Sequence, residues 1–293
     1  MKRFLPLLCI ISCAEPPPVP EGTPRVGATA TAVDGWIYVI GGFNRADIRD
    51  VEAYLPAKKT WKPCAPIPTP RSFAAAALAG GRVVVFGGIA DERTVGAVEA
   101  YDPRTNAWLS REAMPTPRSR LAAAAVGSRI FVVGGMDAKG SSRALEIYDT
   151  STNTWSRGAD LPTARHGLCA VARDGRILAI AGYDQEASAS VEEYDPATNE
   201  WRALPPLKTA RGFSGAALLD GRIFVVGGRK RDLPPTELVE GGTAASLPEN
   251  NWGFGCAAVG RKLYVIGGEA DFGRRVSGRV WEYDLEGDRW SDR

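Results

Sequence analysis

The chain has 293 residues, of which 44% are hydrophobic and 24% charged, a globular composition with enough apolar side chains to build a core. Its 36 Lys and Arg residues nearly balance its 34 Asp and Glu residues, so the formal net charge is +2. Such a chain lacks the basic field that attracts proteins to nucleic acid, and we expect no nucleic-acid partner.

The first thirteen residues have the pattern of a secretory signal peptide. Lys2 and Arg3 form a basic start, and a short apolar run follows at 4–11, where about 20 residues would be needed to cross a membrane. The run ends in Ile-Ile-Ser before Cys13, which resembles the lipobox of bacterial lipoproteins and makes Cys13 the candidate for lipid attachment. The resemblance implies a lipoprotein of the periplasm or cell surface, with the membrane reached only through this lipid. Ordinary cleavage nearby, which would give a soluble exported protein, is the alternative.

The residues after the signal are expected to form a tether without disulfides or metal. Residues 14–24 are rich in proline, which is typical of an extended spacer. Cys64, Cys169 and Cys256 remain in the rest of the chain, an odd number at wide spacing with no Cys-x-x-Cys pair. We therefore interpret these three cysteines as small buried side chains rather than as a zinc or redox site.

Residues 25–293 repeat one unit of about 46 residues six times. A glycine doublet, replaced once by Ala-Gly, ends an apolar run in each unit, and these doublets begin 46, 47, 47, 46 and 40 residues apart. Arginine, glutamate, tyrosine and tryptophan keep the same phase, and Asn251 replaces the arginine in the sixth unit. The repeated residues are Arg25, Arg71, Arg118, Arg165 and Arg211; Glu52, Glu99, Glu146, Glu192, Glu237 and Glu282; Tyr54, Tyr101, Tyr148, Tyr194 and Tyr283; and Trp61, Trp108, Trp155, Trp201 and Trp290.

Each unit is expected to form four antiparallel strands, as the second unit illustrates. Its first strand is a run of small residues at 74–78, which is too short for a stable helix and is bounded by turn residues. The second strand, at 83–86, is apolar throughout, which is typical of a strand buried on both faces. The third strand carries a Val-Glu-x-Tyr pattern at 98–101, and a turn then leads to the fourth strand at Trp108.

The string Tyr-Asp-Pro-x-Thr-Asn-x-Trp is complete at 101–108 and at 194–201. Together with the glycine doublets and the Pro-x-Pro-Thr-Pro-Arg run, it closely resembles the Kelch repeat over residues 25–291. The resemblance implies an all-β, six-bladed β-propeller with four antiparallel strands in each blade. WD40 repeats, the other common blade unit, would need more than the single histidine of this chain. The expected blades span about 25–62, 71–109, 118–156, 165–202, 211–247 and 251–291.

The fifth unit and the two ends of the repeat affect how the ring is built. The fifth unit lacks both the tyrosine and the tryptophan, so we expect a thinner outer edge on that blade. The first unit begins with strand 1 and the sixth ends with strand 4, which leaves no strand to cross the seam between them. We expect packing between blades 1 and 6 to close the ring, and pairing of residues 15–24 with blade 6 would refute this hypothesis.

Two repeated features resemble ligand sites but are better explained by blade construction. The glycine doublets lack a following helix to hold a phosphate, so we interpret them as turns. The arginines could form a ring for acidic ligands, but residues needed in every blade favour paired Arg–Glu contacts within the scaffold. Asn251 would then leave one glutamate with a weaker partner.

Positions that differ between blades are better candidates for recognition. In Kelch propellers the ligand face is built by the 4–1 and 2–3 loops, and the resemblance implies that side chains two places after each arginine face its mouth. Those positions hold Gly27, Phe73, Arg120, Gly167, Phe213 and Gly253. His166 and Trp252 adjoin them, and Arg229 and Arg231 belong to a 2–3 loop. The candidate ligand-binding residues are therefore Phe73, Arg120, Phe213, Trp252, His166, Arg229 and Arg231; alternatively, Phe73 and Phe213 pack only at strand ends.

The sequence favours binding over catalysis. His166 is the single histidine, which excludes a three-histidine metal site, and we assign no catalytic residue, metal or cofactor. The leading interpretation is a monomeric, non-enzymatic binding module for a protein or carbohydrate. The alternatives are an exported enzyme of the sialic-acid mutarotase (epimerase) type and a carbohydrate-binding surface protein. Converging carboxylates with shifted pKa values would favour the enzyme, and a flat, aromatic-rimmed mouth would favour binding.

Overall fold

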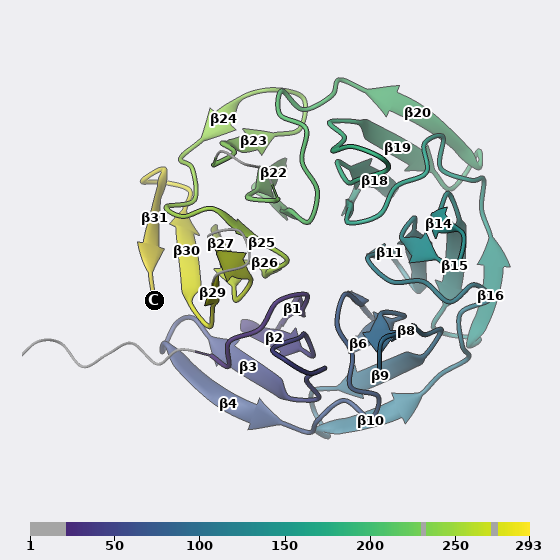
Figure 1. Ribbon diagram of the computed structural model, residues 1–293, viewed down its shortest axis with the longest axis horizontal. Coiled ribbons are helices and arrows are strands. Elements are labelled where there is room, and N and C mark those ends of the chain that lie inside the picture. Colours follow the sequence, from purple (N-terminus) through teal and green to yellow (C-terminus); the bar gives the residue numbers. More distant parts are fainter. Residues whose placement is uncertain (1–21, 230–232, 271–274) are drawn as a thin grey trace, which may run out of the picture.

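The computed structural model describes residues 22–229, 233–270 and 275–293. Six four-stranded antiparallel sheets stand like blades around one axis (Figure 1). The described residues form strands and turns without a helix, so none of them forms a helix long and apolar enough to span a bilayer. The predicted all-β propeller with four antiparallel strands per blade is confirmed.

The strands of each blade follow one another from the axis outwards. Blade 1 contains β1 (Thr29–Val33), β2 (Trp36–Ile40), β3 (Val51–Leu55) and β4 (Thr60–Cys64). Blade 2 contains β5 (Ala75–Ala79), β6 (Arg82–Phe86), β9 (Val98–Asp102) and β10 (Ala107–Ser110). Blade 3 contains β11 (Ala122–Val126), β12 (Arg129–Val133), β15 (Leu145–Asp149) and β16 (Thr154–Arg157).

The second half of the ring repeats this order. Blade 4 contains β17 (Cys169–Arg173), β18 (Arg176–Ile180), β19 (Val191–Asp195) and β20 (Glu200–Leu204). Blade 5 contains β21 (Gly215–Leu219), β22 (Arg222–Val226), β23 (Thr236–Leu238) and β24 (Thr243–Ala244). Blade 6 contains β26 (Gly255–Val259), β27 (Lys262–Ile266), β30 (Val280–Asp284) and β31 (Arg289–Asp292).

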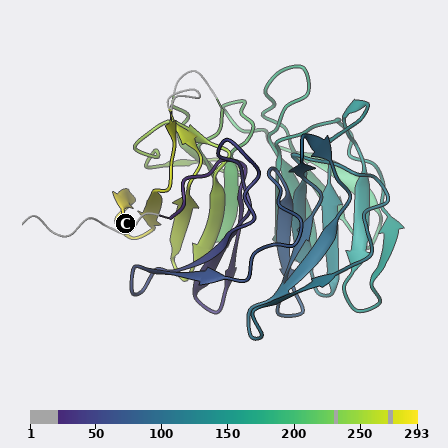
Figure 2. The same ribbon diagram turned by 60° about the horizontal axis from the view of Figure 1, so that its bottom comes forward.

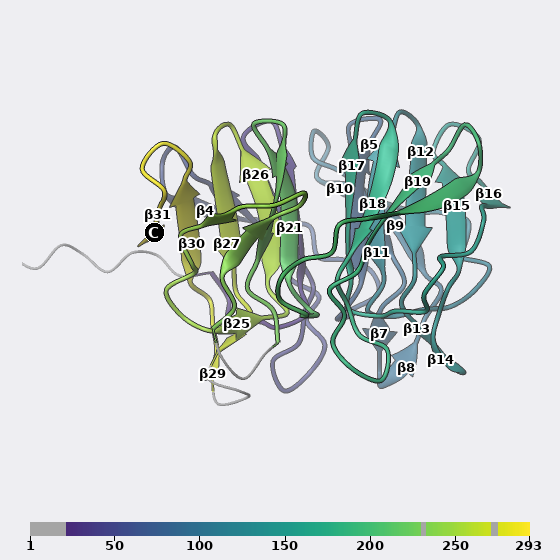
Figure 3. The same ribbon diagram turned by 90° about the horizontal axis from the view of Figure 1, so that it is seen from above.

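Short strands mark one end of the propeller, which we call the mouth face. They are β7 (Ile89–Ala90), β8 (Arg93–Thr94), β13 (Met136–Asp137), β14 (Gly140–Ser141), β25 (Asn251–Trp252), β28 (Glu269–Ala270) and β29 (Arg275–Val276). They lie in the 2–3 loops and in one 4–1 loop, and they project from the lower end of the molecule in Figure 3. The long strands run roughly along the axis, so the 1–2 and 3–4 turns gather at the other end, the far face (Figures 2 and 3).

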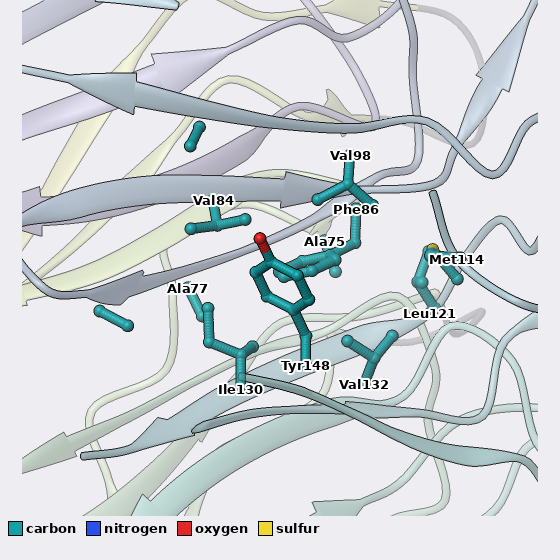
Figure 4. Packing of buried hydrophobic residues seen from close by; sticks show 12 residues of the cluster. Ala75, Ala77, Val84, Phe86, Val98, Met114, Leu121, Ile130, Val132 and Tyr148 are labelled. Atoms are coloured by element: carbon teal, nitrogen blue, oxygen red, sulfur yellow. The ribbon is translucent and has the colours of Figure 1, made fainter. Parts of the chain in front are cut away.

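The core lies between neighbouring blades. Strand 2 of each blade is buried over its last four residues, as at 83–86 of β6. In β5, Ala75 and Ala77 are buried against blade 3, whereas Leu78 faces the central channel. Small side chains therefore let the inner strands crowd around the axis. Figure 4 shows the same packing at the boundary of blades 2 and 3.

The Kelch string ties each outer strand to the preceding blade. In blade 2 the Tyr101 and Trp108 rings lie 5.1 Å apart, and the Tyr101 hydroxyl donates to Asn106 Oδ1 at 2.7 Å. Asn106 Oδ1 also accepts the Ala65 N–H of blade 1, and Trp108 Nε1 donates to the Ala65 carbonyl at 2.8 Å. Equivalent contacts recur in blades 3, 4 and 6. The phased tyrosine and tryptophan thus join blades as well as filling them.

The repeated arginines are ion-paired within their own blades. Arg118 is fully buried, and its Nη2 lies 2.7 Å from Glu146 Oε2. Its Nη1 donates to the carbonyls of Gly134 and Ala144, so the guanidinium also fixes the loop after strand 2. The same pairing occurs in Arg25–Glu52, Arg71–Glu99, Arg165–Glu192 and Arg211–Glu237. These guanidinium groups are committed to the scaffold and do not face a ligand.

Blade 6 corrects the predicted glutamate pattern. The strand register places Trp281, not a glutamate, opposite Val265, the second-last residue of strand 2. In the other five blades the residue opposite this position is the paired glutamate. Glu282 comes one residue later and therefore points to the other face of the sheet. The expectation that Asn251 leaves Glu282 weakly partnered is also wrong, because Lys262 and Arg293 both bind its carboxylate. Blade 6 has thus lost both members of the Arg–Glu pair.

The seam between blades 6 and 1 is closed by backbone hydrogen bonds as well as by packing. Bonds like those at the other blade boundaries cross it, and one of them joins Gly22, within residues 15–24, to blade 6, which is the pairing that refutes the expected closure by packing. Within the described part of the chain, no strand is exchanged across the seam. The bonds run from Gly22 N–H to Gly278 O (3.1 Å), from Gly268 N–H to Arg25 O (2.8 Å) and from Gly27 N–H to Gly253 O (2.6 Å).

Blade 5 has the reduced outer edge that its sequence predicts. Its third strand, β23, has three residues and its fourth, β24, has two. The outer strands of the other blades have four or five residues. Loss of the tyrosine and tryptophan therefore shortens the two strands that these residues would join.

Candidate functional site

The mouth face is organised in three tiers of equivalent residues, one from each blade. The inner tier, two residues after each repeated Arg or Asn, comprises Gly27, Phe73, Arg120, Gly167, Phe213 and Gly253. The middle tier, one residue before it, comprises Val26, Ser72, Ser119, His166, Gly212 and Trp252. The outer tier, directly after each doublet, comprises Phe43, Ile89, Met136, Tyr183, Arg229 and Glu269. β-Bridges pair the middle and outer tiers in every blade.

The inner tier forms a closed ring of backbone hydrogen bonds. Each N–H donates to the carbonyl of the equivalent residue in the preceding blade, over distances of 2.6–3.0 Å. All six residues have positive φ, which glycine adopts freely but which strains Phe73 (+52°), Arg120 (+52°) and Phe213 (+54°). Strained backbone of this kind persists where the surroundings determine it and is a marker of functional positions. The ring fixes three side chains at the axis and uses all six of its own N–H donors.

Two phenyl rings lie across the glycines of this tier. A Cβ atom on Gly27 would lie 3.0 Å from the Phe73 ring, and one on Gly167 would lie 3.1 Å from the Phe213 ring. Phe73 and Phe213 meet edge to face with their centroids 6.1 Å apart. The phenyl rings therefore occupy the space that a side chain at Gly27 or Gly167 would fill. Phe73 and Phe213 pack here, and both stay half-exposed to the mouth.

Phe213 is the centre of an aromatic cluster on blades 4 to 6. Its ring lies 6.0 Å from His166, 5.7 Å from Tyr183 and 5.6 Å from Trp252. The Tyr183 hydroxyl donates to the backbone carbonyl of Arg229 at 2.6 Å, which joins two neighbouring loops. Half-buried aromatic rings that are held by one another present a rigid apolar plate to the solvent.

Two arginines border this plate. The Arg120 guanidinium lies 5.4 Å from the centre of the Phe73 ring, and its Nη1 contacts the Met136 sulfur at 3.0 Å. Among the described residues, Arg120 has no acidic partner. The exposed Arg229 lies 5.4 Å from the Trp252 ring. The plate is therefore flanked by positive charge on both sides.

The other ionisable groups of the tiers are His166 and Glu269. His166 Nδ1 lies 2.9 Å from Ser141 Oγ. Burial, and then the charge of Arg120, lower the pKa of His166 below its ordinary value of 6.5, so the ring is neutral at pH 7. Burial raises the pKa of Glu269, and Arg229 opposes this shift.

The central channel lies behind the ring. Its walls are the inner strands, with Ala76, Ala123, Ala170 and Ala216 facing inwards, and it encloses about 180 Å³ next to the ring and about 540 Å³ towards the far face. Leu78 is among the more exposed side chains of the wide end. The wider part of the channel therefore opens towards the far face. Among the described residues, no three His, Cys, Asp or Glu side chains gather as metal ligands.

Six of the predicted binding residues lie together at this mouth: Phe73, Arg120, His166, Phe213, Arg229 and Trp252. Arg231 and Cys13 lie outside the described residues. Sequence reasoning missed Met136, Ser141, Tyr183 and Glu269. Three of these four, Met136, Tyr183 and Glu269, directly follow a glycine doublet or its Ala-Gly equivalent. This fixed position in the repeat could have identified them from the sequence.

Comparison with known proteins agrees with this architecture. The family model described as the KLHDC2/KLHL20/DRC7 Kelch-repeats domain matches residues 27–228, and a Kelch motif matches residues 253–292. A solved structure titled "Structure of YjhT" is similar over 94% of this chain and 99% of its own, with a TM-score of 0.80 and 18% identity. This likeness concerns the fold alone. The matched repeats, which cover more than half of the chain, show that it belongs to the Kelch-repeat family.

Proposed function

We propose that this protein is a non-enzymatic binding module that recognises an acidic segment of a partner protein with its mouth face. The supporting observation is the plate centred on Phe213, flanked by Arg120 and Arg229. Trp, Tyr and Arg side chains that are held in place supply most of the binding energy at protein interfaces. An acidic segment would bring its carboxylates to the two guanidinium groups and its apolar atoms to the plate.

The rigidity of the mouth supports this proposal. The ring of backbone hydrogen bonds fixes the inner tier before any ligand arrives, so little conformational entropy is lost on binding. We further propose that the module works outside the cytoplasm, held by a lipid on Cys13, because the N-terminal segment has the signal pattern described above.

The test is crosslinking in intact cells followed by recovery of the protein and its partners. Glycine is the natural residue of the inner tier in three blades, so Phe213→Gly and Arg120→Gly remove side chains without disturbing the ring. We expect each variant to lose at least about tenfold of the recovered partner. Leu109→Ala, which changes an exposed residue of β10 far from the axis, is the matched control and should recover it fully. Full recovery by both glycine variants would refute the assignment of this face.

A mutarotase-type enzyme is a second candidate, and Glu269 is the observation that favours it. This carboxyl group is half-buried with a raised pKa beside Arg229, which suits a proton carrier next to a group that binds a carboxylate. The neutral His166 is the other proton carrier of the tiers. Exchange between the anomers of N-acetylneuraminic acid, followed by NMR, tests this function. Acceleration by the wild type and its loss in Glu269→Gln would replace the binding proposal with the enzyme.

A further inference from the structure

The far face carries a second set of equivalent positions, one at each blade boundary. Where the repeat carries both aromatic markers, a site comprises the first and third residues of strand 2, the third residue of strand 3, the residue three places after the tryptophan of strand 4, and the tyrosine of the next blade. At the seam these are Lys262, Tyr264, Glu282, Arg293 and Tyr54. At the boundary of blades 2 and 3 they are Arg82, Val84, Ala100, Arg111 and Tyr148.

Backbone pairing establishes that the two sites are equivalent. Tyr264 pairs with Glu282 across β27 and β30, as Val84 pairs with Ala100 across β6 and β9. The residues after strand 4 also make the same bond. Arg293 N–H donates to Val280 O and Arg111 N–H donates to Val98 O, both at 2.9 Å.

At the seam a carboxylate fills the site. Glu282 Oε1 lies 2.6 Å from Lys262 Nζ and 2.9 Å from Arg293 Nη2. Its other oxygen accepts the Tyr264 hydroxyl at 3.0 Å. Two cations and one phenol therefore bind one buried carboxylate at this position of the repeat.

At the boundary of blades 2 and 3 the cations remain but the carboxylate is missing. Ala100 stands in the place of Glu282, and Val84 stands in the place of Tyr264. Arg82 and Arg111 line a cavity of about 360 Å³ beside Tyr148, and Ser128, Thr150 and Ser151 complete its wall. Figure 4 shows the Val84 side chain beside the Tyr148 ring. At three other boundaries an aromatic ring takes the Val84 position and packs on the next tyrosine: Tyr38 on Tyr101, Phe131 on Tyr194 and Phe224 on Tyr283.

Donors are available in this cavity. Arg111 has no hydrogen-bonded or ion-paired side-chain partner among the described residues, although its charge acts on Tyr148. Arg82 contacts Asp102 through Nη2 at 3.2 Å, which leaves its buried Nε without a partner. The Tyr148 hydroxyl is committed to Asn153. The donors that lack partners in this cavity therefore belong to the two arginines.

We propose that this cavity, which we call the far-face cavity, binds a small hydroxylated carboxylate whose carboxyl group takes the place that Glu282 occupies at the seam. Arg82 and Arg111 bind the carboxylate, and the hydroxyl-bearing wall faces the rest of the ligand. A volume of about 360 Å³ suits a molecule of the size of one sugar acid. The site lies at the end of the propeller opposite the mouth face, so the two proposals are independent.

The probes for the test are D-glucuronate and, as its neutral counterpart, D-glucose, both followed by isothermal titration calorimetry. We expect glucuronate to bind with a dissociation constant of about 1 mM or lower and glucose not to bind. Arg111→Leu introduces the residue that blade 4 carries at this position, Leu204, and should weaken glucuronate binding at least about tenfold. Arg157→Leu, on an exposed arginine of β16, and Phe213→Gly, at the mouth, should leave binding unchanged.

Ala100→Glu tests the same site without an added ligand. This substitution rebuilds the seam arrangement, so the new carboxylate should be bound by Arg82 and Arg111, raise the melting temperature and abolish glucuronate binding. A fall in melting temperature would show that the two cations do not serve a carboxylate there. That result, or the absence of saturable glucuronate binding up to about 10 mM, would overturn the proposal.

Discussion

Replacing Glu282 with alanine removes the carboxylate that joins β27 and β30 at the seam. The variant leaves Lys262, Arg293 and the buried Tyr264 hydroxyl without their shared acceptor. Removing one partner of a buried ion pair costs about 3–5 kcal/mol of unfolding free energy. The Lys262 side chain is 42% exposed and the Arg293 side chain 26%, so both regain water, and we expect a loss of about 2–3 kcal/mol. For a chain of this size the melting temperature should fall by about 4–5 °C.

The stabilisation by Glu282 should depend on pH in a direction that follows from its pKa. Burial alone would raise the pKa of Glu282, but hydrogen bonds from Arg293, Lys262 and Tyr264 hold it below the ordinary value of 4.5. Because the folded pKa is lowered, the stabilisation is present above the pKa of the unfolded chain and is lost as pH falls through the folded pKa. The difference in unfolding free energy between wild type and Glu282→Ala should therefore be constant near neutral pH and narrow below about pH 4.5.

Urea denaturation followed by circular dichroism, repeated across this pH range, measures that difference. Glu286→Ala, which removes an exposed partner of Arg261 in the same blade, is the matched control and should not shift the transition. Acetate should raise the melting temperature of Glu282→Ala more than that of the wild type, because it can enter the vacated place. A loss below about 0.5 kcal/mol, or a difference that widens in acid, would refute the reasoning.

Three further predictions follow from the scaffold, the mouth and the N-terminus. Arg118→Met leaves Glu146 buried and unpaired, so the free energy of unfolding measured in urea should fall by about 3–5 kcal/mol. The double variant Arg118→Met/Glu146→Leu should recover most of this loss, and equal losses in both variants would contradict the prediction. The chain has a single histidine, so its NMR titration is free of overlap, and the midpoint of His166 should lie below 6.5 and rise in Arg120→Gly. An unchanged midpoint would show that the charge of Arg120 does not act on His166. Cys13→Ser should abolish incorporation of radiolabelled palmitate and release the protein from membranes; labelling that persists would remove Cys13 as the lipid site.

The repeat made the fold predictable because its markers do the same physical work in every blade. Tyr101 and Trp108 join blade 2 to blade 1 through contacts that recur around the ring, so their spacing alone indicates the architecture. The spacing gave a wrong prediction in blade 6, where the strand register decides which face a side chain occupies. Glu282 falls one residue from the expected phase, and a shift of one residue along a strand moves a side chain to the opposite face.

The candidate site was predictable only in part. The inner tier followed from the resemblance to Kelch propellers, which implied that residues two places after each repeated arginine face the mouth, and the structure brings Phe73, Arg120 and Phe213 together there. Tyr183 joins them from a loop whose path the sequence does not specify. The far-face cavity results from small side chains at Val84 and Ala100 beside two arginines, and such a space is visible only once the blades are packed.

Crosslinking followed by mass spectrometry in intact cells tests most directly the claim that this protein binds through the residues that differ between its blades. Partner peptides should attach near His166, Arg229 and Trp252 on the mouth face, and they should disappear in Phe213→Gly. Attachment along the outer strands β4, β10 and β16, unchanged by that substitution, would contradict the account.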